Sequence, residues 1–176
     1  YYEEIELPIV TVLEVMELNG TYADIEILSD MSKKNDKILK DLKKKIYHIS
    51  GSEFNLNSSQ QLANILFDEL KLPQVKKRST AEDVLKILSS YNQIPAYIIK
   101  YRKKNKLKTT YFDSLPEFVN AETSRIHTTF NQTVAATGRL SSTNPNFQNI
   151  PIRSEEGKEI RKAFSSQKKN WKILSA

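Results

Sequence analysis

The sequence predicts an α+β fold, in which a mainly helical region is followed by short strands and loops. Two observations support this prediction. Apolar residues recur every three to four positions up to about residue 120, which is typical of amphipathic helices. After residue 120, the segment 125–135 alternates and is rich in β-branched residues, which favours strands.

The first predicted helix covers residues 2–18, with Ile5, Ile9, Leu13 and Met16 on one face. Gly20 is expected to end it, because glycine readily adopts the left-handed backbone found after helices. Asp24 is then a suitable N-cap for a second helix.

The second helix is expected to make about seven turns and to end at Gly51-Ser52. Seven lysines occupy its polar faces: Lys33, Lys34, Lys37, Lys40, Lys43, Lys44 and Lys45. Its apolar stripe, which Asn35 breaks, consists of Leu28, Met31, Ile38, Leu42, Ile46 and Ile49.

Two further helices follow, each with a capping-box candidate. Ser58 with Gln61 predicts a helix to about Leu70, and Ser79 with Glu82 predicts a helix through residue 88. The residues between them, Lys76-Lys77-Arg78, are interpreted as a short basic loop.

A fifth helix is predicted to start at Pro95 and to end near Pro116, with six bases among residues 100–108. Residues 137–157 have the composition of a loop, and a short helix is expected at 156–163. The final strand is predicted at 171–175.

Composition excludes several kinds of site. The 176 residues include no cysteine, which excludes a disulfide scaffold, a thiolate zinc site and a cysteine nucleophile. Two histidines, His48 and His127, argue against a histidine-rich metal site. No apolar run approaches the roughly 18 residues needed to span a bilayer, and the opening residues are not a signal peptide. We therefore expect a soluble, intracellular protein.

Charge is distributed unevenly along the chain. Residues 1–30 hold eight acids and no bases (−8), whereas the other 146 residues hold 27 bases and 13 acids (+14), which gives +6 in total. Such asymmetry is typical of a basic region that faces a polyanion. A solvated surface that keeps the protein soluble explains it equally well, so charge alone leaves both interpretations open.

The residues supply no self-contained catalytic site. The sequence has no glycine-rich phosphate loop and no helical pair of metal ligands, the motifs by which such sites are recognised. Ser141 and Ser142 lack a convincing base, since the nearby His127 is interpreted as structural.

The segment 133–153, TVAATGRLSSTNPNFQNIPIR, concentrates hydrogen-bond donors on irregular backbone. Arg139 follows Gly138, which permits close approach of the backbone. The minor groove of duplex DNA offers acceptors at every base pair, so donors there would hold any sequence. The alternative, that these amides bond their own backbone in turns, has equal weight. The other donors are Asn144, Asn146, Gln148, Asn149 and Arg153.

TVAATGRLSSTNPNFQNIP closely resembles the first signature of the family A DNA polymerases, of the bacterial DNA polymerase I type. YEEIELPIVTVLEVMELNG resembles the family's entry into its polymerase region, and FNLNSSQQLANILFDEL, STAEDVLKIL and YRKKNKLKTTY resemble its thumb helices. RIHTTFNQ and IPIRSEEGKEIRKAF resemble the segments that flank the signature, and WKILSA resembles the strand leading to the first catalytic Asp. The resemblance covers essentially the whole chain.

The resemblance implies an acidic entry helix in 1–30, a helical thumb in 31–120 and the start of a polymerase palm in 121–176. It implies primer–template DNA as the partner of a monomer that lies with the bacterial chromosome in the cytoplasm. The intact protein would be a DNA-directed DNA polymerase, a nucleotidyltransferase that uses deoxynucleoside triphosphates and two Mg²⁺ ions. Because the chain stops at Ala176, before the family's metal-binding Asp residues, we expect it to hold no metal and to be inactive alone.

The resemblance also implies roles for individual residues. Arg139 matches the family Arg that enters the minor groove at the primer terminus. Asn146 and Gln148 match residues that make neighbouring minor-groove or sugar contacts. Asn149 and Arg153 match positions near template and primer, close to the active site.

In the thumb, the resemblance implies contacts with DNA phosphates. The start of one helix, where free N–H groups suit a phosphate, comprises Asn57, Ser58 and Ser59. The thumb tip contributes Lys76 and Lys77. The residues that match the long thumb helix are Arg102, Lys106, Lys108, Thr109 and Thr110.

One departure concerns the tip, because Lys77-Arg78-Ser79 is shorter than the family's usual glycine-containing loop. Two alternatives to a polymerase fragment remain: a non-catalytic DNA-binding module derived from the family, and a helical interaction domain whose basic face is merely solvated.

Overall fold

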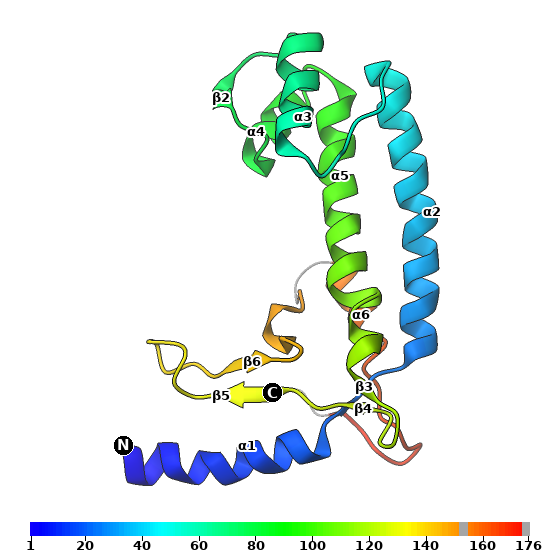
Figure 1. Cartoon of the computed structure of the whole chain (residues 1–176). Coiled ribbons are helices and arrows are strands. Elements are labelled where there is room, and N and C mark those ends of the chain that lie inside the picture. Colours follow the sequence, from blue (N-terminus) through cyan, green and yellow to red (C-terminus); the bar gives the residue numbers. More distant parts are fainter. Residues whose placement is uncertain (152–154, 174–176) are drawn as a thin grey trace. The chain divides into compact units, whose positions relative to one another are not determined.

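The computed structural model describes residues 1–151 and 155–173 of the chain. Helical segments dominate up to Phe118, and short strands, turns and one further helix follow (Figure 1). This order confirms the predicted α+β class. The chain divides into two compact units, a helical unit formed by residues 32–108 and a mixed unit formed by residues 1–31 and 109–176.

The helical unit holds most of α2 and all of the elements that follow it up to residue 107. Helix α3 continues directly into the π-helical η2, so that the two form one helical run from 59 to 69. The elements are α2 (Ile25–Ser50), α3 (Ser59–Ala63), η2 (Asn64–Glu69), β2 (Val75–Arg78), α4 (Glu82–Leu88) and α5 (Gln93–Leu107).

The core of the helical unit lies between α2, the α3–η2 run, α4 and α5. Its residues have almost no exposed surface, so their burial drives the packing of these helices. They include Ile46, Leu62, Leu66, Val84, Leu85, Leu88, Ile94 and Ile98.

The buried side of α2 differs from the predicted apolar stripe. Leu39 is 8% exposed and Ile38 is 36% exposed, so the stripe passes through Leu39. Asn35 does not break the stripe but belongs to it, since it is only 5% exposed. Its Nδ2 donates to the carbonyl of Lys104 at 3.5 Å, and this hydrogen bond makes burial of the amide tolerable.

Side-chain caps start three of these helices, since Asp24 caps α2 as predicted by accepting from the N–H of Glu26 at 3.0 Å. Ser58 caps α3 as predicted, with its Oγ accepting from the backbone N–H of Gln61 at 3.3 Å. Helix α5 begins two residues before the predicted Pro95, because Asn92 caps it by accepting from the N–H of Ile94 at 2.8 Å.

The second predicted capping box is wrong. The residue before α4 is Ala81, and the Oγ of Ser79 accepts from the N–H of Ala81 at 3.3 Å, ahead of the helix. Glu82 instead pairs with Lys86 and Lys103. The helix still buries Val84, Leu85 and Leu88 as predicted.

The mixed unit contains the remaining elements. The predicted short helix near 156–163 is present as α6. The elements are η1 (Tyr2–Glu6), α1 (Leu7–Asn19), β1 (Thr21–Tyr22), η3 (Lys108–Phe112), η4 (Leu115–Phe118), β3 (Val119–Asn120), β4 (Arg125–Ile126), β5 (Thr129–Asn131), β6 (Ser141–Thr143), η5 (Phe147–Asn149) and α6 (Glu155–Arg161).

The strands form two small antiparallel sheets. In the first, β4 lies between β1 and β3, and Ile126 is paired with both Thr21 and Val119. In the second, β5 pairs with β6, and Phe130 lies opposite Ser142. The predicted strand region 125–135 is thus divided, since residues 127 and 128 belong to neither sheet.

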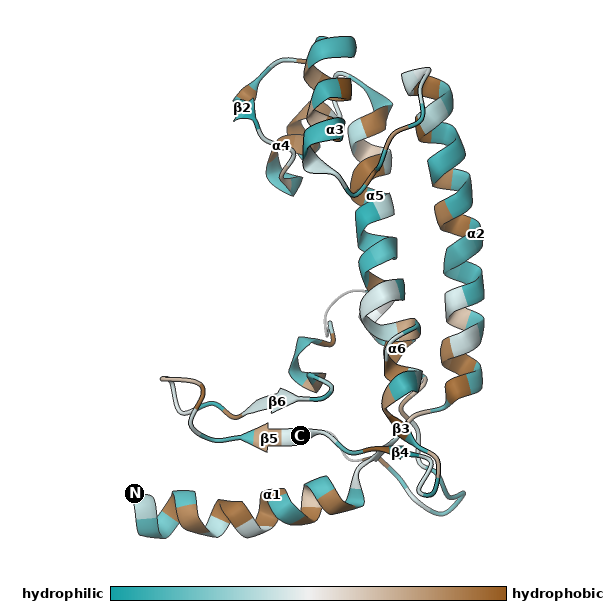
Figure 2. Cartoon of the chain, in the orientation of Figure 1, coloured by the Kyte–Doolittle hydropathy of each residue, from teal (hydrophilic) through white to brown (hydrophobic). Residues whose placement is uncertain are grey.

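Helix α1 ends as predicted, at Gly20, whose φ is +59°. Its predicted apolar face is only weakly used, because Leu13 is the one buried residue of the helix. Hydrophobic residues recur along its length (Figure 2), and several are about half exposed: Leu7, Val10, Val12, Val15 and Met16.

Residues 171–173 adopt no strand, in contrast to the prediction, and residues 174–176 lie outside the described range. Within the described residues, no helix has an apolar stretch long enough to cross a membrane.

Candidate nucleic-acid interface

In the helical unit, the residue that precedes the cap of α3 lies beside the last turn of α5. The Oδ1 atom of Asn57, just before the cap Ser58, accepts from the Nδ2 of Asn105 at 3.5 Å. The first N–H groups of a helix have no partners within it, and Ser59, the first residue of α3, is exposed. The N–H groups of Asn57 and Ser58 donate to Asn55, at 3.0 and 2.9 Å, so the N–H of Ser59 is the donor that the predicted group 57–59 presents. It lies near Asn105 of α5, which sequence reasoning missed.

Arg102 and Lys106 lie one turn apart on α5 but have different surroundings. The guanidinium of Arg102 donates to the carbonyl of Thr80 at 2.6 Å, and burial lowers its pKa. Lys106 is exposed, and within the described residues it has no partner. Both lie at a pocket whose lining is Glu82, Leu85, Ile99, Arg102, Lys103 and Lys106. Lys106 is thus the cation available to a ligand, and Arg102 supports the fold.

Lys108 turns toward α2. Its Nζ donates to the Oγ of Ser32 at 2.6 Å and lies 3.5 Å from the carboxylate of Asp36. Its side chain is only 18% exposed. Arg102 and Lys108 were both predicted to contact DNA phosphates, but each is bonded to another residue of the helical unit.

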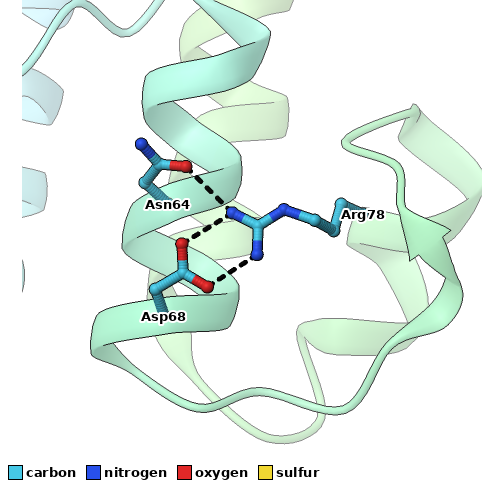
Figure 3. A network of polar contacts seen from close by, with 3 residues as sticks. All are labelled: Asn64, Asp68 and Arg78. Atoms are coloured by element: carbon cyan, nitrogen blue, oxygen red, sulfur yellow. Dashed lines mark hydrogen bonds and ion pairs between the residues drawn. The ribbon is translucent and has the colours of Figure 1, made fainter.

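The segment predicted as a basic loop is the extended segment β2, and two of its three cations are paired internally. Arg78 reaches back to η2, where its guanidinium contacts both oxygens of Asp68 at 2.6 Å and the Oδ1 of Asn64 at 2.9 Å (Figure 3). Lys76 pairs with Asp83 at 2.7 Å. Lys77 is exposed, with φ +47°, and no described residue pairs with it.

In the mixed unit, the signature segment, residues 133–151, forms most of the connection between β5 and β6, strand β6 itself and the turns after it. Residues 132–140 connect the two strands, and Gly138 adopts a φ of +74° in this connection. Arg139 follows it, is exposed, and forms no ion pair with any residue that the structure describes. The guanidinium is therefore available to an external acceptor.

The amides after β6 partly bond their own backbone, as the turn alternative requires. The Oδ1 of Asn146 accepts from the N–H of Gln148 at 3.0 Å and from the hydroxyl of Ser142 at 3.3 Å. The Nε2 of Gln148 donates to the carbonyl of Leu140 at 2.6 Å. Asn146 thus uses its acceptor internally, and its Nδ2 donor has no partner within the described range.

Three of the remaining predicted residues lie at the surface. The side chain of Asn149 is exposed, and so are Thr109 and Thr110 in η3. Arg153 lies outside the described residues, so its position cannot be compared with the prediction.

Several residues that fix the signature segment were missed by sequence reasoning. The Oγ1 of Thr128, which is buried, lies 2.9 Å from the carbonyl oxygen of Thr143 and 2.7 Å from that of Pro145, so its single O–H is shared between the two. The hydroxyl of Tyr111 donates to the carbonyl of Asn149, and burial raises the pKa of that tyrosine. A buried hydroxyl needs such a partner, but nothing in the sequence identifies the carbonyl that supplies it.

His127 and Glu17 connect the residues at the start of β5 to helix α1. The Nδ1 of His127 lies 2.8 Å from the carbonyl of Glu17, and its Nε2 lies 2.8 Å from the hydroxyl of Thr123. Because a carbonyl only accepts, Nδ1 carries the proton in the neutral ring. The Glu17 carboxylate accepts from the N–H of Phe130 at 2.6 Å. His127 is therefore held on both sides within the fold.

Among the described residues, no three His, Asp or Glu side chains come together in a way that could hold a metal ion. The residues present therefore do not fit a two-ion centre, and no chemical step is assigned to metal ions within them.

Comparison with protein families gives one match that covers most of the chain. The model of DNA polymerase family A matches residues 25–176.

Curated relatives match over nearly the whole chain. It is 44% identical over 179 residues to DNA polymerase I of Bacillus subtilis (strain 168), which covers 99% of this chain and 20% of that protein. It is 46% identical over 179 residues to DNA polymerase I of Pseudomonas aeruginosa, covering 98% of this chain and 20% of that protein. The chain thus spans about a fifth of the length of these relatives.

A solved structure has a similar fold. It is described as the POL domain of Pol1 from M. smegmatis in complex with DNA primer-template and dNTP. The TM-score is 0.85 at 40% sequence identity, and the match covers 92% of this chain and 29% of that one.

Proposed function

The chain belongs to DNA polymerase family A, and from this premise we propose that it is the primer–template-binding part of a DNA-directed DNA polymerase. Residues 31–120 are assigned to the thumb, residues 121–176 to the start of the palm, and residues 1–30 to an entry segment at their base. The protein acts as a monomer on chromosomal DNA in the bacterial cytoplasm.

The observation that carries the proposal is the structural match to a polymerase domain in complex with primer-template, at a TM-score of 0.85 and 40% identity. The local chemistry supports it. Arg139, Asn149 and the Nδ2 of Asn146 are donors with no partner within the described residues. Such donors suit the acceptors that the minor groove offers at every base pair.

We assign contacts near the primer terminus to the signature segment. Arg139 donates to minor-groove acceptors at the terminal pair, and Asn146 supports the neighbouring position. Gln148 holds the loop through Leu140 and contacts sugar or base with its remaining donor. Asn149 and Arg153 lie near template and primer in this assignment.

We assign phosphate contacts to the helical unit. Lys106 and the N–H group of Ser59 at the start of α3 bind one strand, and Asn57 and Ser58, whose N–H groups donate to Asn55, hold that helix start in place. Lys77 extends the contact at the tip. Thr109 and Thr110 add hydroxyl donors. Arg102, Lys76 and Lys108 are each bonded within the unit, so they contribute positive potential and position their neighbours.

In the whole protein, the reaction is nucleotidyl transfer in DNA replication or repair. The primer 3′-hydroxyl attacks the α-phosphate of a deoxynucleoside triphosphate, and pyrophosphate leaves. Two Mg²⁺ ions assist such displacements. The share of the present residues is to position the duplex, and a displacement of about 1 Å can cost on the order of 10²-fold in rate.

The test is fluorescence anisotropy on the full-length protein, with a labelled primer–template and a single strand of equal length at two salt concentrations. We expect preference for the duplex and steep weakening by salt, because phosphate contacts release counterions. Binding without nucleotide incorporation would favour a non-catalytic DNA-binding module. The absence of duplex binding would favour a helical interaction domain and overturn the proposal.

A further inference from the structure

Helix α2 carries a row of lysines on its solvent side. Its buried side passes through Asn35, Leu39, Leu42 and Ile46. At about 100° per residue, a second set of side chains projects from the opposite side of the helix. We call this set the lysine row. It consists of Lys37, Lys40 and Lys44, all of which are exposed.

The charges of the lysine row are not compensated within the described residues, since no acid there pairs with them. The two acids nearest to the row on the same helix have other partners. Asp36 lies 3.5 Å from Lys108, and Asp41 lies 2.9 Å from Lys45. The helical unit as a whole has 18 basic and 7 acidic residues in 32–108, which gives a net charge of +11. The row therefore adds positive potential to an already basic unit.

We propose that the lysine row is a second surface for duplex DNA, in addition to the contacts proposed for α3 and α5 and, separately, for the signature segment. This inference rests on the proposed function, because it requires that the protein works on duplex DNA. The row would bind phosphates without regard to sequence and would hold a stretch of duplex other than the one at the primer terminus.

The spacing of the row suits a phosphate backbone. A helix rises about 1.5 Å per residue, so Lys37 and Lys40 are about 4.5 Å apart along the axis, and Lys40 and Lys44 about 6 Å. A DNA strand presents a phosphate about every 3.4 Å along the helix axis. Lysine is a flexible point charge rather than a fixed fork, so each side chain can reach a phosphate without an exact register.

The surroundings of the row favour nucleic acid over a membrane. Helices that lie on membranes combine a basic face with a large apolar face that enters the lipid. The apolar side of α2 is already buried, and the helix is otherwise mostly hydrophilic (Figure 2). Duplex DNA is also the partner assigned to the contacts in the proposed function. Duplex bound there would raise the local concentration of DNA at α2.

The experiment measures binding of a labelled duplex closed by hairpins at both ends, which offers no primer terminus, to the full-length protein. The test variant is Lys37→Gln/Lys40→Gln/Lys44→Gln. The matched control, Lys86→Gln/Lys158→Gln/Lys162→Gln, removes the same charge from lysines that are paired with acids. Each lost phosphate contact lowers the slope of log K against log salt by about 0.9.

We expect the test variant to lower this slope by about 2 to 3 between roughly 50 and 200 mM salt, with a change of less than about 1 in the control. Equal slopes in the wild type and the test variant would overturn the inference while leaving the proposed function intact. Failure of the wild type to bind any duplex would overturn both. Competition by polyglutamate as strong as competition by duplex would assign the row to an acidic polypeptide and also overturn the inference.

Discussion

Arg78 and Asp68 form a two-pronged ion pair that ties the extended segment β2 to the helical segment η2. Both distances are 2.6 Å, and Asn64 adds a third contact to the same guanidinium (Figure 3). The chain between Leu70 and Gln74 forms no regular element. The ion pair therefore fixes β2 against η2 although the residues that connect them form no regular structure.

We predict that Asp68→Asn lowers the thermal stability of the protein slightly at neutral pH. The effect is small because both side chains are about half exposed, and exposed ion pairs contribute little. The hydrogen bond from Arg78 holds the pKa of Asp68 below its usual value. A depressed carboxyl pKa stabilises the fold above the unfolded pKa, and this contribution is lost as pH falls through the folded pKa.

The measurement for Asp68→Asn is the melting temperature of the variant and the wild type from neutral to acid pH. The difference between the two should shrink on acidification. Glu69→Gln is the matched control, since Glu69 is a neighbouring exposed acid that pairs with no described residue. A difference that stays constant with pH would show that the Asp68 charge is not the cause.

We predict that Leu85→Ala destabilises the helical unit by about 2–5 kcal/mol, the usual range for deleting a fully buried leucine side chain. Leu85 has no exposed surface and lies in the core between α4 and α5. Ile87 is on the same helix but is about half exposed. In chemical denaturation, Ile87→Ala should change the free energy of unfolding by about 0.5 kcal/mol or less. Equal losses in the two variants would contradict the observed packing of α4.

We predict that Gly20→Ala is strongly destabilising for two separate reasons. Gly20 has φ +59° and ψ −176°, a backbone region that is essentially restricted to glycine and costs other residues about 1–3 kcal/mol. A Cβ there would also lie 2.8 Å from the His127 ring and from the carbonyl of Ile126.

Gly51→Ala is the control that separates these two reasons. Gly51 has φ +73°, but a Cβ there would meet nothing within 4 Å. Thermal melting should therefore show a larger loss for Gly20→Ala than for Gly51→Ala. Equal losses would mean that the contact with His127 relaxes without cost and that backbone strain alone acts.

Sequence patterns predicted the elements whose signals are local. The Asp24, Ser58 and Gly20 helix boundaries depend on one or two residues, and the structure confirms each of them. The predicted Asn35 break was wrong because helix periodicity treats every polar residue as exposed, whereas Asn35 is buried against a carbonyl of α5. Such a partner is distant in sequence and leaves no local signal.

The distinction between local and tertiary signals also explains which residues of the candidate site could be predicted from the sequence. The resemblance to a family signature located Arg139 and Asn146, which keep free donors in the structure. It could not separate Lys106, which is exposed, from Lys108, which is bonded to Ser32. Both are lysines of one basic segment, and only tertiary packing decides which charge remains available.

The last prediction distinguishes an effect on the rate of nucleotide incorporation from an effect on the affinity for primer–template, in the full-length protein. Arg139→Ala should slow single-nucleotide incorporation by on the order of 10²-fold and weaken primer–template binding much less, because the proposed function assigns its donor to the terminal base pair. Lys106→Ala should do the reverse, with the salt slope of binding reduced by about 0.9 and the incorporation rate at saturating DNA nearly unchanged. Rapid-quench kinetics and anisotropy measure the two quantities on the same preparations. Parallel losses of rate and affinity in Arg139→Ala would show that this arginine merely holds DNA, and the assignment of the signature segment to the primer terminus would then have to be abandoned.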